Sequence, residues 1–319
     1  MAEVEVFRTK RKEEKKRSAR LEDFLFTLKL IVHNRIAFAG LIITLAYFVI
    51  AIIDYIDPKW LGVSNLSDAL AFLHGKAYYP SATLVTPPTL AHGWYYWLGT
   101  TEYGIPILPD MLAALKVDLT LSVEIVLTGA LIGLILGTVS AYYGGLIDEA
   151  MMRITDIFFS IPALILALAI AFIIGLTFTN IALAFIIVWW PIYARLGRSL
   201  TLSIKNMNFI EAANAAGSSS ARNIFYHVIP GVLSPLFVQF SLDIGTVVQL
   251  FAALEFLGVV PVDPFLPELG RMMVWGETYL IFGKWWAVIV PAIFLMIFTI
   301  SVSLLGDGLR DVLDPRQRR

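Results

Sequence analysis

Long apolar segments alternate with polar or proline-rich segments along the whole chain. Residues 36–53 contain no charged side chain, and neither do residues 285–306 near the other end. A helix of about 20 apolar residues crosses the hydrocarbon core of a bilayer. Both segments are therefore predicted to be transmembrane helices. Because no small-residue cleavage site follows the first one, we interpret residues 36–54 as an uncleaved signal anchor that forms the first span.

A second span is predicted at residues 117–143. It carries Glu124 as the only charge in its middle, and it is followed by Gly144 and Gly145. Adjacent glycines break helices, so we expect the span to end there.

The second half of the chain has room for three more spans before the last one. Residues 157–194 hold no charge, but they are too long for one helix. They predict two helices joined by a tight turn, one before Gly175 and one after Asn180. A fifth span is predicted at residues 231–258, which include Asp243. The pattern as a whole predicts an all-α polytopic membrane protein with six transmembrane helices.

Composition supports a membrane protein. The chain is 58% hydrophobic and 15% charged, with a mean hydropathy of +0.76. A soluble domain of this length needs a larger charged surface. The sequence has no cysteine, which excludes disulfides, thiolate metal sites and cysteine nucleophiles.

The distribution of Lys and Arg predicts the orientation. If the N-terminus is cytoplasmic, 19 of the 24 Lys and Arg residues fall in cytoplasmic segments. Cytoplasmic loops are enriched in these residues. We therefore expect both termini inside the cell and the segment 55–115 outside.

Two segments lie outside the predicted spans at the N-terminal end. Residues 1–35 form a basic tail, which we expect to be a surface helix or disordered; nucleic-acid binding is not favoured, because no aromatic or glycine-rich framework accompanies the charge. Residues 55–115 are rich in proline and aromatic residues and predict an extracellular loop. Its aromatic residues are typical of a membrane-interface belt, with a stacking surface for sugar rings as the alternative.

Residues 195–230 form a polar segment between the fourth and fifth spans. The run that starts at Glu211 has small side chains and strongly favours a helix, and small side chains let another protein approach the backbone closely. Gly217 can end this helix with a positive φ, and Pro230 can begin the next span. The pattern predicts a short helix suited to docking in a groove, with an ordinary alanine-rich loop helix as the alternative.

The spacing of Glu211-Ala212-Ala213, Gly217 and Pro230 resembles the EAA coupling loop of binding-protein-dependent ABC importers. Residues 97–319 are similar to the permease subunits of dipeptide, oligopeptide and nickel importers, of the second-permease type. Each matching stretch is short, but together they are specific. The stretches are Leu98-Gly99-Thr100, Ala141-Tyr142-Tyr143-Gly144-Gly145, Met152-Arg153-Ile154-Thr155-Asp156, Tyr193-Ala194-Arg195, Phe256-Leu257-Gly258, Gly306-Asp307-Gly308-Leu309-Arg310-Asp311 and Leu313-Asp314-Pro315.

The resemblance implies a type I ABC importer fold, with residues 116–319 as the transmembrane core, in the plasma membrane. It implies a homologous second permease, two cytoplasmic ATP-binding subunits, an external solute-binding protein and membrane lipid as partners, and no nucleic acid. ATP and Mg would be bound by the ATP-binding subunits, since this chain lacks a G-x-x-x-x-G-K-[ST] motif. The resemblance implies no cofactor, metal or catalytic residue in this chain. The resemblance also implies which residues couple ATP hydrolysis to movement of the spans: Glu211, Ala212, Ala213 and Gly217.

Peptides are the expected cargo, with oligosaccharides or nickel as alternatives. The sequence departs from the family pattern near the end of span five, where the usual Glu is Phe251 and a usual Ser is Glu255. The Gly99-Thr100 segment also lacks the Gly-Arg-Asp continuation that the family usually has. These departures leave the fold prediction intact, but they weaken any inference about cargo.

Two mid-membrane carboxylates support a competing hypothesis, an ion-coupled secondary transporter that uses Glu124 and Asp243. No repeated halves or paired broken helices accompany them. An intramembrane enzyme is a third class, but the four His residues are scattered and form no H-E-x-x-H motif.

The importer hypothesis makes the same carboxylates candidates for the translocation pathway. Gln239, Asp243 and Thr246 fall at i, i+4 and i+7 and share one helical face. A charged residue facing lipid at mid-span costs about 3 kcal/mol, so Asp243 is expected to point away from lipid. Contact with cargo and a hydrogen bond to another span are both open. Glu124 is expected to line the pathway or face the bundle, and Gly306 and Gly308 are expected to end the last span.

Overall fold

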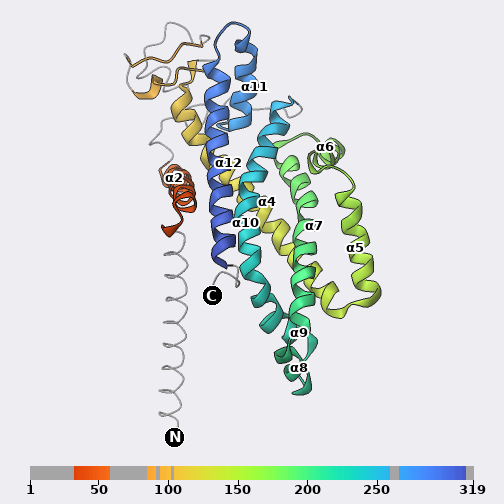
Figure 1. Ribbon diagram of the computed structural model, residues 1–319. Coiled ribbons are helices and arrows are strands. Elements are labelled where there is room, and N and C mark those ends of the chain that lie inside the picture. Colours follow the sequence, from red (N-terminus) through yellow and green to blue (C-terminus); the bar gives the residue numbers. More distant parts are fainter. Residues whose placement is uncertain (1–31, 58–84, 91–93, 102–103, 259–265, 314–319) are drawn as a thin grey trace.

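The computed structural model describes residues 32–57, 85–90, 94–101, 104–258 and 266–313 (Figure 1). Within these ranges the chain forms helices and turns and no β-strand, so the all-α prediction is confirmed. The elements are α2 (Arg35–Ile56), η1 (Trp94–Tyr96), α4 (Ile107–Tyr143), α5 (Gly145–Phe159), α6 (Ala163–Ile174), α7 (Phe178–Lys205), α8 (Asn208–Ala215), α9 (Ser220–Asn223), η3 (Ile224–Val228), α10 (Ile229–Phe256), α11 (Leu269–Leu280) and α12 (Trp286–Leu313).

Five of the described helices are long and apolar enough to cross a membrane, namely α2, α4, α7, α12 and the Pro235–Phe256 part of α10. The pair α5 and α6 supplies a sixth crossing if it is taken as one span. The six predicted spans are all found when α5 and α6 are counted as one broken span, the third. In Figure 1, α4, α7, α10 and α12 run side by side along the long axis of the molecule, and α5 and α6 lie on the flank beyond α7.

The third span bends by 91° between α5 and α6, so the prediction of one helix from residue 157 to Gly175 is wrong. Pro162 disfavours helical conformation in the residue before it and has no N–H to donate. Ser160 ends α5, and its hydroxyl donates to the carbonyl of Ile157 (2.7 Å). The helix that follows is only 12 residues long. It is therefore about 18 Å long, too short to cross the hydrocarbon core alone.

The predicted turn between Gly175 and Asn180 is confirmed. Gly175 ends α6 with a φ of 105°, a conformation that favours glycine. The Asn180 side chain donates to the carbonyls of Ile174 (2.8 Å) and Gly175 (3.0 Å). Thr177 caps the next helix by accepting from the Asn180 backbone N–H. This short segment thus provides hydrogen-bond partners for backbone groups at the end of α6 and at the start of α7.

Close contact between α4 and α7 forms the centre of the bundle. At Gly137 an added Cβ would lie 2.0 Å from the Ala194 carbonyl oxygen, and at Gly133 it would lie 2.2 Å from that of Trp190. Only glycine therefore fits at these two points of α4. Small residues at helix contacts are the usual way for membrane helices to pack closely.

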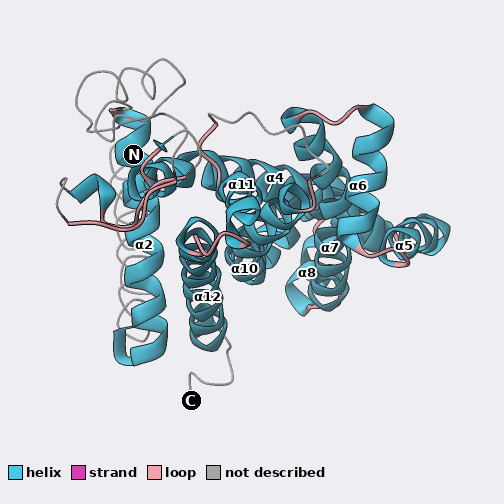
Figure 2. Ribbon diagram, turned by 90° about the horizontal axis from the view of Figure 1, so that it is seen from above, coloured by secondary structure: helices cyan, strands magenta, loops and turns pink. Residues whose placement is uncertain are grey.

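The first and last spans pack against each other at the edge opposite α5 (Figure 2). Tyr47 of α2 stacks on Phe294 and donates its hydroxyl to the Phe294 carbonyl (2.9 Å). The prediction that Gly306 and Gly308 end the last span is wrong, because α12 continues to Leu313. An added Cβ at Gly306 would lie 2.3 Å from the Leu242 side chain, and one at Gly308 the same distance from Ala37. These glycines serve helix packing.

Two predicted loops contain more helix than their polarity indicated. Helix α4 begins at Ile107, inside the predicted loop 55–115, and α7 continues to Lys205, inside the predicted loop 195–230. Helix α11 lies between the fifth and last predicted spans. Hydropathy identifies the apolar part of a helix, so it misses the helical turns at either end that carry polar residues.

Candidate functional site

Helix α8 projects at one end of the molecule, and α11 lies at the opposite end (Figure 1). Helix α8 ends at the position that the sequence predicted. Gly217 has a φ of 82°, and its N–H donates to the Asn214 carbonyl (2.9 Å). The N–H of Ser218 donates to the Ala213 carbonyl (3.0 Å). This pair of hydrogen bonds is a Schellman motif, which satisfies carbonyls at a helix end and favours glycine at this position.

One side chain anchors α8, and most of the others are exposed. Ile210 is 1% exposed and is the buried residue of this helix. Glu211 and Ala212 are exposed, and Ala213 is half-buried. Two large apolar side chains beside them, Met207 and Phe209, are also exposed. Exposed apolar side chains next to small ones are typical of a protein-binding surface. We call the exposed residues Met207, Phe209, Glu211 and Ala212 the α8 face.

Asp243 lies inside the bundle, 4% exposed. The indole N–H of Trp189 in α7 donates to its Oδ2 atom (3.0 Å), and the Gln239 amide donates to its Oδ1 atom (2.8 Å). Asp243 therefore points away from lipid, as expected. Of the two open alternatives, the geometry supports a hydrogen bond to another span.

The other two residues of the predicted α10 stripe have different surroundings. Gln239 is half-buried, and Thr246 is exposed with its hydroxyl bonded to the Leu242 carbonyl of its own helix (3.1 Å). The exposed polar surface continues to Gln249, one turn further on, which the sequence analysis missed. Gln249 borders a hollow of about 360 Å³, whose other lining residues are Met273, Ala292, Leu295, Met296, Thr299 and Ile300.

Glu124 does not face the bundle interior; it is exposed on α4 beside α2. It borders a groove of about 460 Å³ between these two helices. Thr120 and Thr128 flank it on the same face of α4, and Lys116 lies at the end of this row, where it pairs with the buried Asp54 (3.4 Å). A carboxylate in contact with lipid is costly. This face of α4 is therefore better suited to a partner subunit or to water.

A group of buried charges near α11 was not predicted from the sequence. Arg271 of α11 forms an ion pair with Asp110 of α4, and both are almost completely buried. Glu268 begins α11 and accepts from the Arg271 backbone N–H (2.6 Å). Burial raises the pKa of Glu268, and the Arg271 charge works against that shift. No local signal marks these residues, because the ion pair joins distant parts of the chain.

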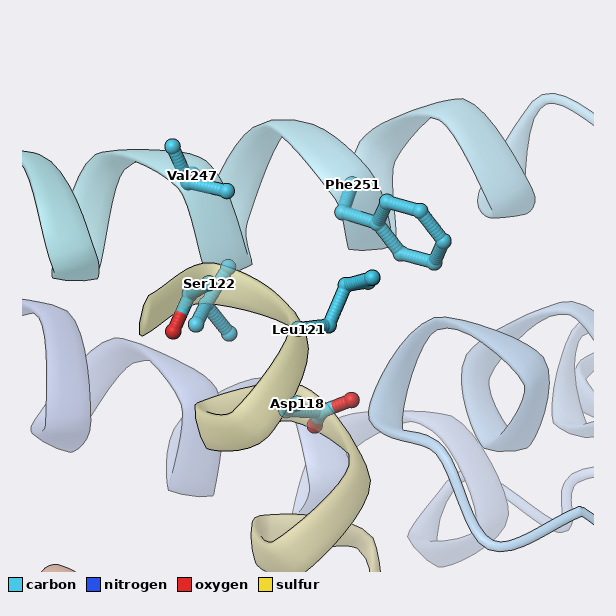
Figure 3. Close-up of a pocket in the computed structure, with 6 residues that line it drawn as sticks. Asp118, Leu121, Ser122, Val247 and Phe251 are labelled. Atoms are coloured by element: carbon cyan, nitrogen blue, oxygen red, sulfur yellow. The ribbon is translucent and has the colours of Figure 1, made fainter. Parts of the chain in front are cut away.

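Asp118 of α4 is also buried, and it interacts electrostatically with Glu268 and Arg271 of this group. Figure 3 shows Asp118, Leu121 and Ser122 on one side, with Val247 and Phe251 of α10 facing them. The space between these side chains leaves no room for a water molecule. Phe251, which replaces the usual Glu of the family pattern, therefore seals α4 against α10.

Comparison with known proteins gives consistent matches over most of the chain. Residues 129–319 match the family described as "Binding-protein-dependent transport system inner membrane component". The chain is 34% identical to the dipeptide transport system permease protein of Alkalihalophilus pseudofirmus, over 91% of this chain and 89% of that relative. It is 35% identical to a probable D,D-dipeptide transport system permease protein of Escherichia coli, over 72% and 75%. It is also 35% identical to a glutathione transport system permease protein of Pectobacterium atrosepticum, over 72% and 74%.

Proposed function

Because the chain belongs to the family of binding-protein-dependent transport system inner membrane components, we propose that it forms a peptide path through the cell membrane together with a homologous second permease. The chain itself is a multi-pass permease subunit of such an importer. The matched relatives are named for the transport of dipeptides, D,D-dipeptides and glutathione, which supports short peptides as the cargo class.

The α8 face is proposed as the contact with an ATP-binding subunit in the cytoplasm. The observation that carries this role is a helix held by a single buried side chain, Ile210, with Glu211 and Ala212 left exposed. Met207 and Phe209 contribute apolar surface to the α8 face. Such a short helix fits a groove of a partner protein. Two ATP-binding subunits would bind ATP and Mg, one of them against this loop and the other against the second permease.

The face of α10 that carries the exposed residues Thr246 and Gln249 is proposed to line the peptide path. Thr246 and Gln249 offer uncharged polar groups on an otherwise apolar surface, and Gln249 borders a hollow with two methionines. Uncharged donors and acceptors suit peptide amides, and flexible methionines fit apolar side chains of different shapes. An external solute-binding protein would deliver the cargo at the α11 end, opposite α8.

The test is uptake by the complete complex reconstituted in vesicles, with labelled dipeptide and the solute-binding protein. The proposal expects uptake that requires both ATP and the binding protein and persists when an ionophore collapses ion gradients. Uptake that an ionophore abolishes while ATP is present would instead support an ion-coupled transporter. Competition by unlabelled dipeptide, oligosaccharide or Ni²⁺ identifies the cargo class, and inhibition only by one of the last two would overturn the peptide assignment.

A further inference from the structure

Asn223 joins three elements: α9, to which it belongs, α8 and the end of α4. It is the last residue of α9, and it is completely buried at 0% exposure. Its side-chain amide nitrogen donates to the hydroxyl of Tyr142 at the end of α4 (3.1 Å) and to Oδ1 of Asn214 in α8 (2.6 Å). An amide nitrogen has two hydrogens to donate, so this bridge uses its full donor capacity.

The bridge is a polar connection of α8 to the membrane-spanning helix α4. Ile210 is the buried residue of α8, and it provides an apolar anchor near the start of that helix. Asn214 lies one turn further on and is itself exposed, so water could satisfy its side chain without Asn223. The bond between the two asparagines therefore positions α8 more than it satisfies Asn214.

Residues at both ends of the coupling loop contact Tyr142. Lys205, the last residue of α7, places its ammonium group 5.8 Å from the centre of the Tyr142 ring, within range of a cation–π contact. Asn223 reaches the hydroxyl of the same tyrosine from the other end of the loop. Because Gly144 breaks the helix directly afterwards, Tyr142 lies in the last turn of α4.

The segment after Asn223 connects the same junction to α10. Residues Ile224–Val228 form a single π-helical segment that leads directly into α10. Single π-helical turns inside helices occur frequently at functional sites. A displacement of Asn223 can therefore reach α10 along the chain and α4 through the Tyr142 hydrogen bond.

We propose that Asn223 is a positioning residue that transmits movement of α8 to the end of α4, so that α4 and α10 move together when the ATP-binding subunits close. This inference rests on the proposed function, in which α8 contacts an ATP-binding subunit. The step is mechanical: a rigid connection lets the same displacement reach both helices, and a broken one lets α8 move without α4.

The cleanest test is Tyr142→Phe, which removes one hydroxyl and keeps the aromatic ring near Lys205. The complete complex is reconstituted, and imported dipeptide is measured together with ATP hydrolysed. Loss of one such hydrogen bond corresponds to about a fivefold change in an equilibrium. We expect the dipeptide imported per ATP to fall by about this factor while hydrolysis continues. The matched control is Tyr143→Phe, because Tyr143 is the exposed neighbour at 57%.

Asn223→Ala removes both bonds of the bridge and should lower the same ratio further. In that background, Tyr142→Phe should have no additional effect, since both changes act through one connection. A normal ratio in Tyr142→Phe would overturn the proposal, and so would a loss of complex or of hydrolysis in proportion to uptake, which indicates a purely structural role. Failure of the proposed function has a different result, because then the wild-type complex would show no ATP-dependent uptake.

Discussion

Arg271 of α11 pairs with Asp110 of α4, although 161 positions separate them in the chain. Their side chains are 5% and 2% exposed. Figure 1 places α11 at the end of the molecule opposite α8. The ion pair therefore fixes this end of the bundle, and the Asn223 bridge fixes the other. A buried pair is not a strong source of stability by itself, but removing one partner leaves an uncompensated charge.

Replacing Arg271 tests this relationship. Arg271→Met leaves Asp110 and Glu268 buried without the cation, and we expect a loss of stability of about 3–5 kcal/mol. The measurement is thermal unfolding of the purified chain in detergent. Adding Asp110→Asn should restore part of the loss. Lys284→Met is the control, because Lys284 is only partly buried and its ammonium group lies over the Tyr279 ring. Equal melting temperatures for Arg271→Met and the control would contradict the prediction.

Two substitutions of Asp243 test whether the protein needs its charge or only its hydrogen bonds. In Asp243→Asn the new carbonyl can accept from Trp189, and the Gln239 amide can rotate to accept from the new NH₂ group. We expect this variant to assemble and to transport normally. Asp243→Leu leaves the Trp189 donor buried and unpaired, at a cost of about 1–3 kcal/mol, and should lower the amount of assembled complex. An Asp243→Asn complex that assembles but does not transport would show that the charge itself is required.

Gly217 tests the end of α8. An added Cβ at Gly217 meets nothing within 4 Å, so a substitution acts through its φ of 82° and not through a clash. Asn adopts this conformation readily, and β-branched Val does so poorly, at a cost of about 1–3 kcal/mol. We expect Gly217→Val to hydrolyse ATP without matching uptake while the complex still assembles. Gly217→Asn is the control and should remain coupled; uncoupling in both variants to the same degree would count against the backbone explanation.

Two glycines at the α4–α7 contact form a matched pair. At Gly137 an added methyl would lie 2.0 Å from the Ala194 carbonyl oxygen, whereas at Gly197 its nearest neighbour would be 3.5 Å away. Gly137→Ala should therefore force the two helices apart and lower the amount of folded protein in the membrane. Gly197→Ala should be tolerated, because alanine favours the helix and meets only ordinary contacts. Quantitative immunoblotting of membranes distinguishes the two, and equal amounts would refute the steric argument.

Local sequence determined the features that depend on neighbouring residues. Apolar length predicted the spans. Single glycines predicted the turn at Gly175 and the helix end at Gly217, because glycine adopts the positive φ of a helix end without steric cost. The bend at Pro162 was missed although its signal is also local: the uncharged run hid it, since hydropathy does not register a break in backbone conformation.

Tertiary structure decided what each side chain touches. Gly306 and Gly217 are the same residue type, yet one lies inside α12 against Leu242 and the other ends α8. Asp243 and Thr246 are neighbours on one helix, but α7 covers only the first of them. The Asn223–Tyr142 bond joins positions 81 residues apart. A sequence pattern specifies backbone conformation over a few residues, whereas burial and hydrogen bonding depend on which distant helix packs against that segment.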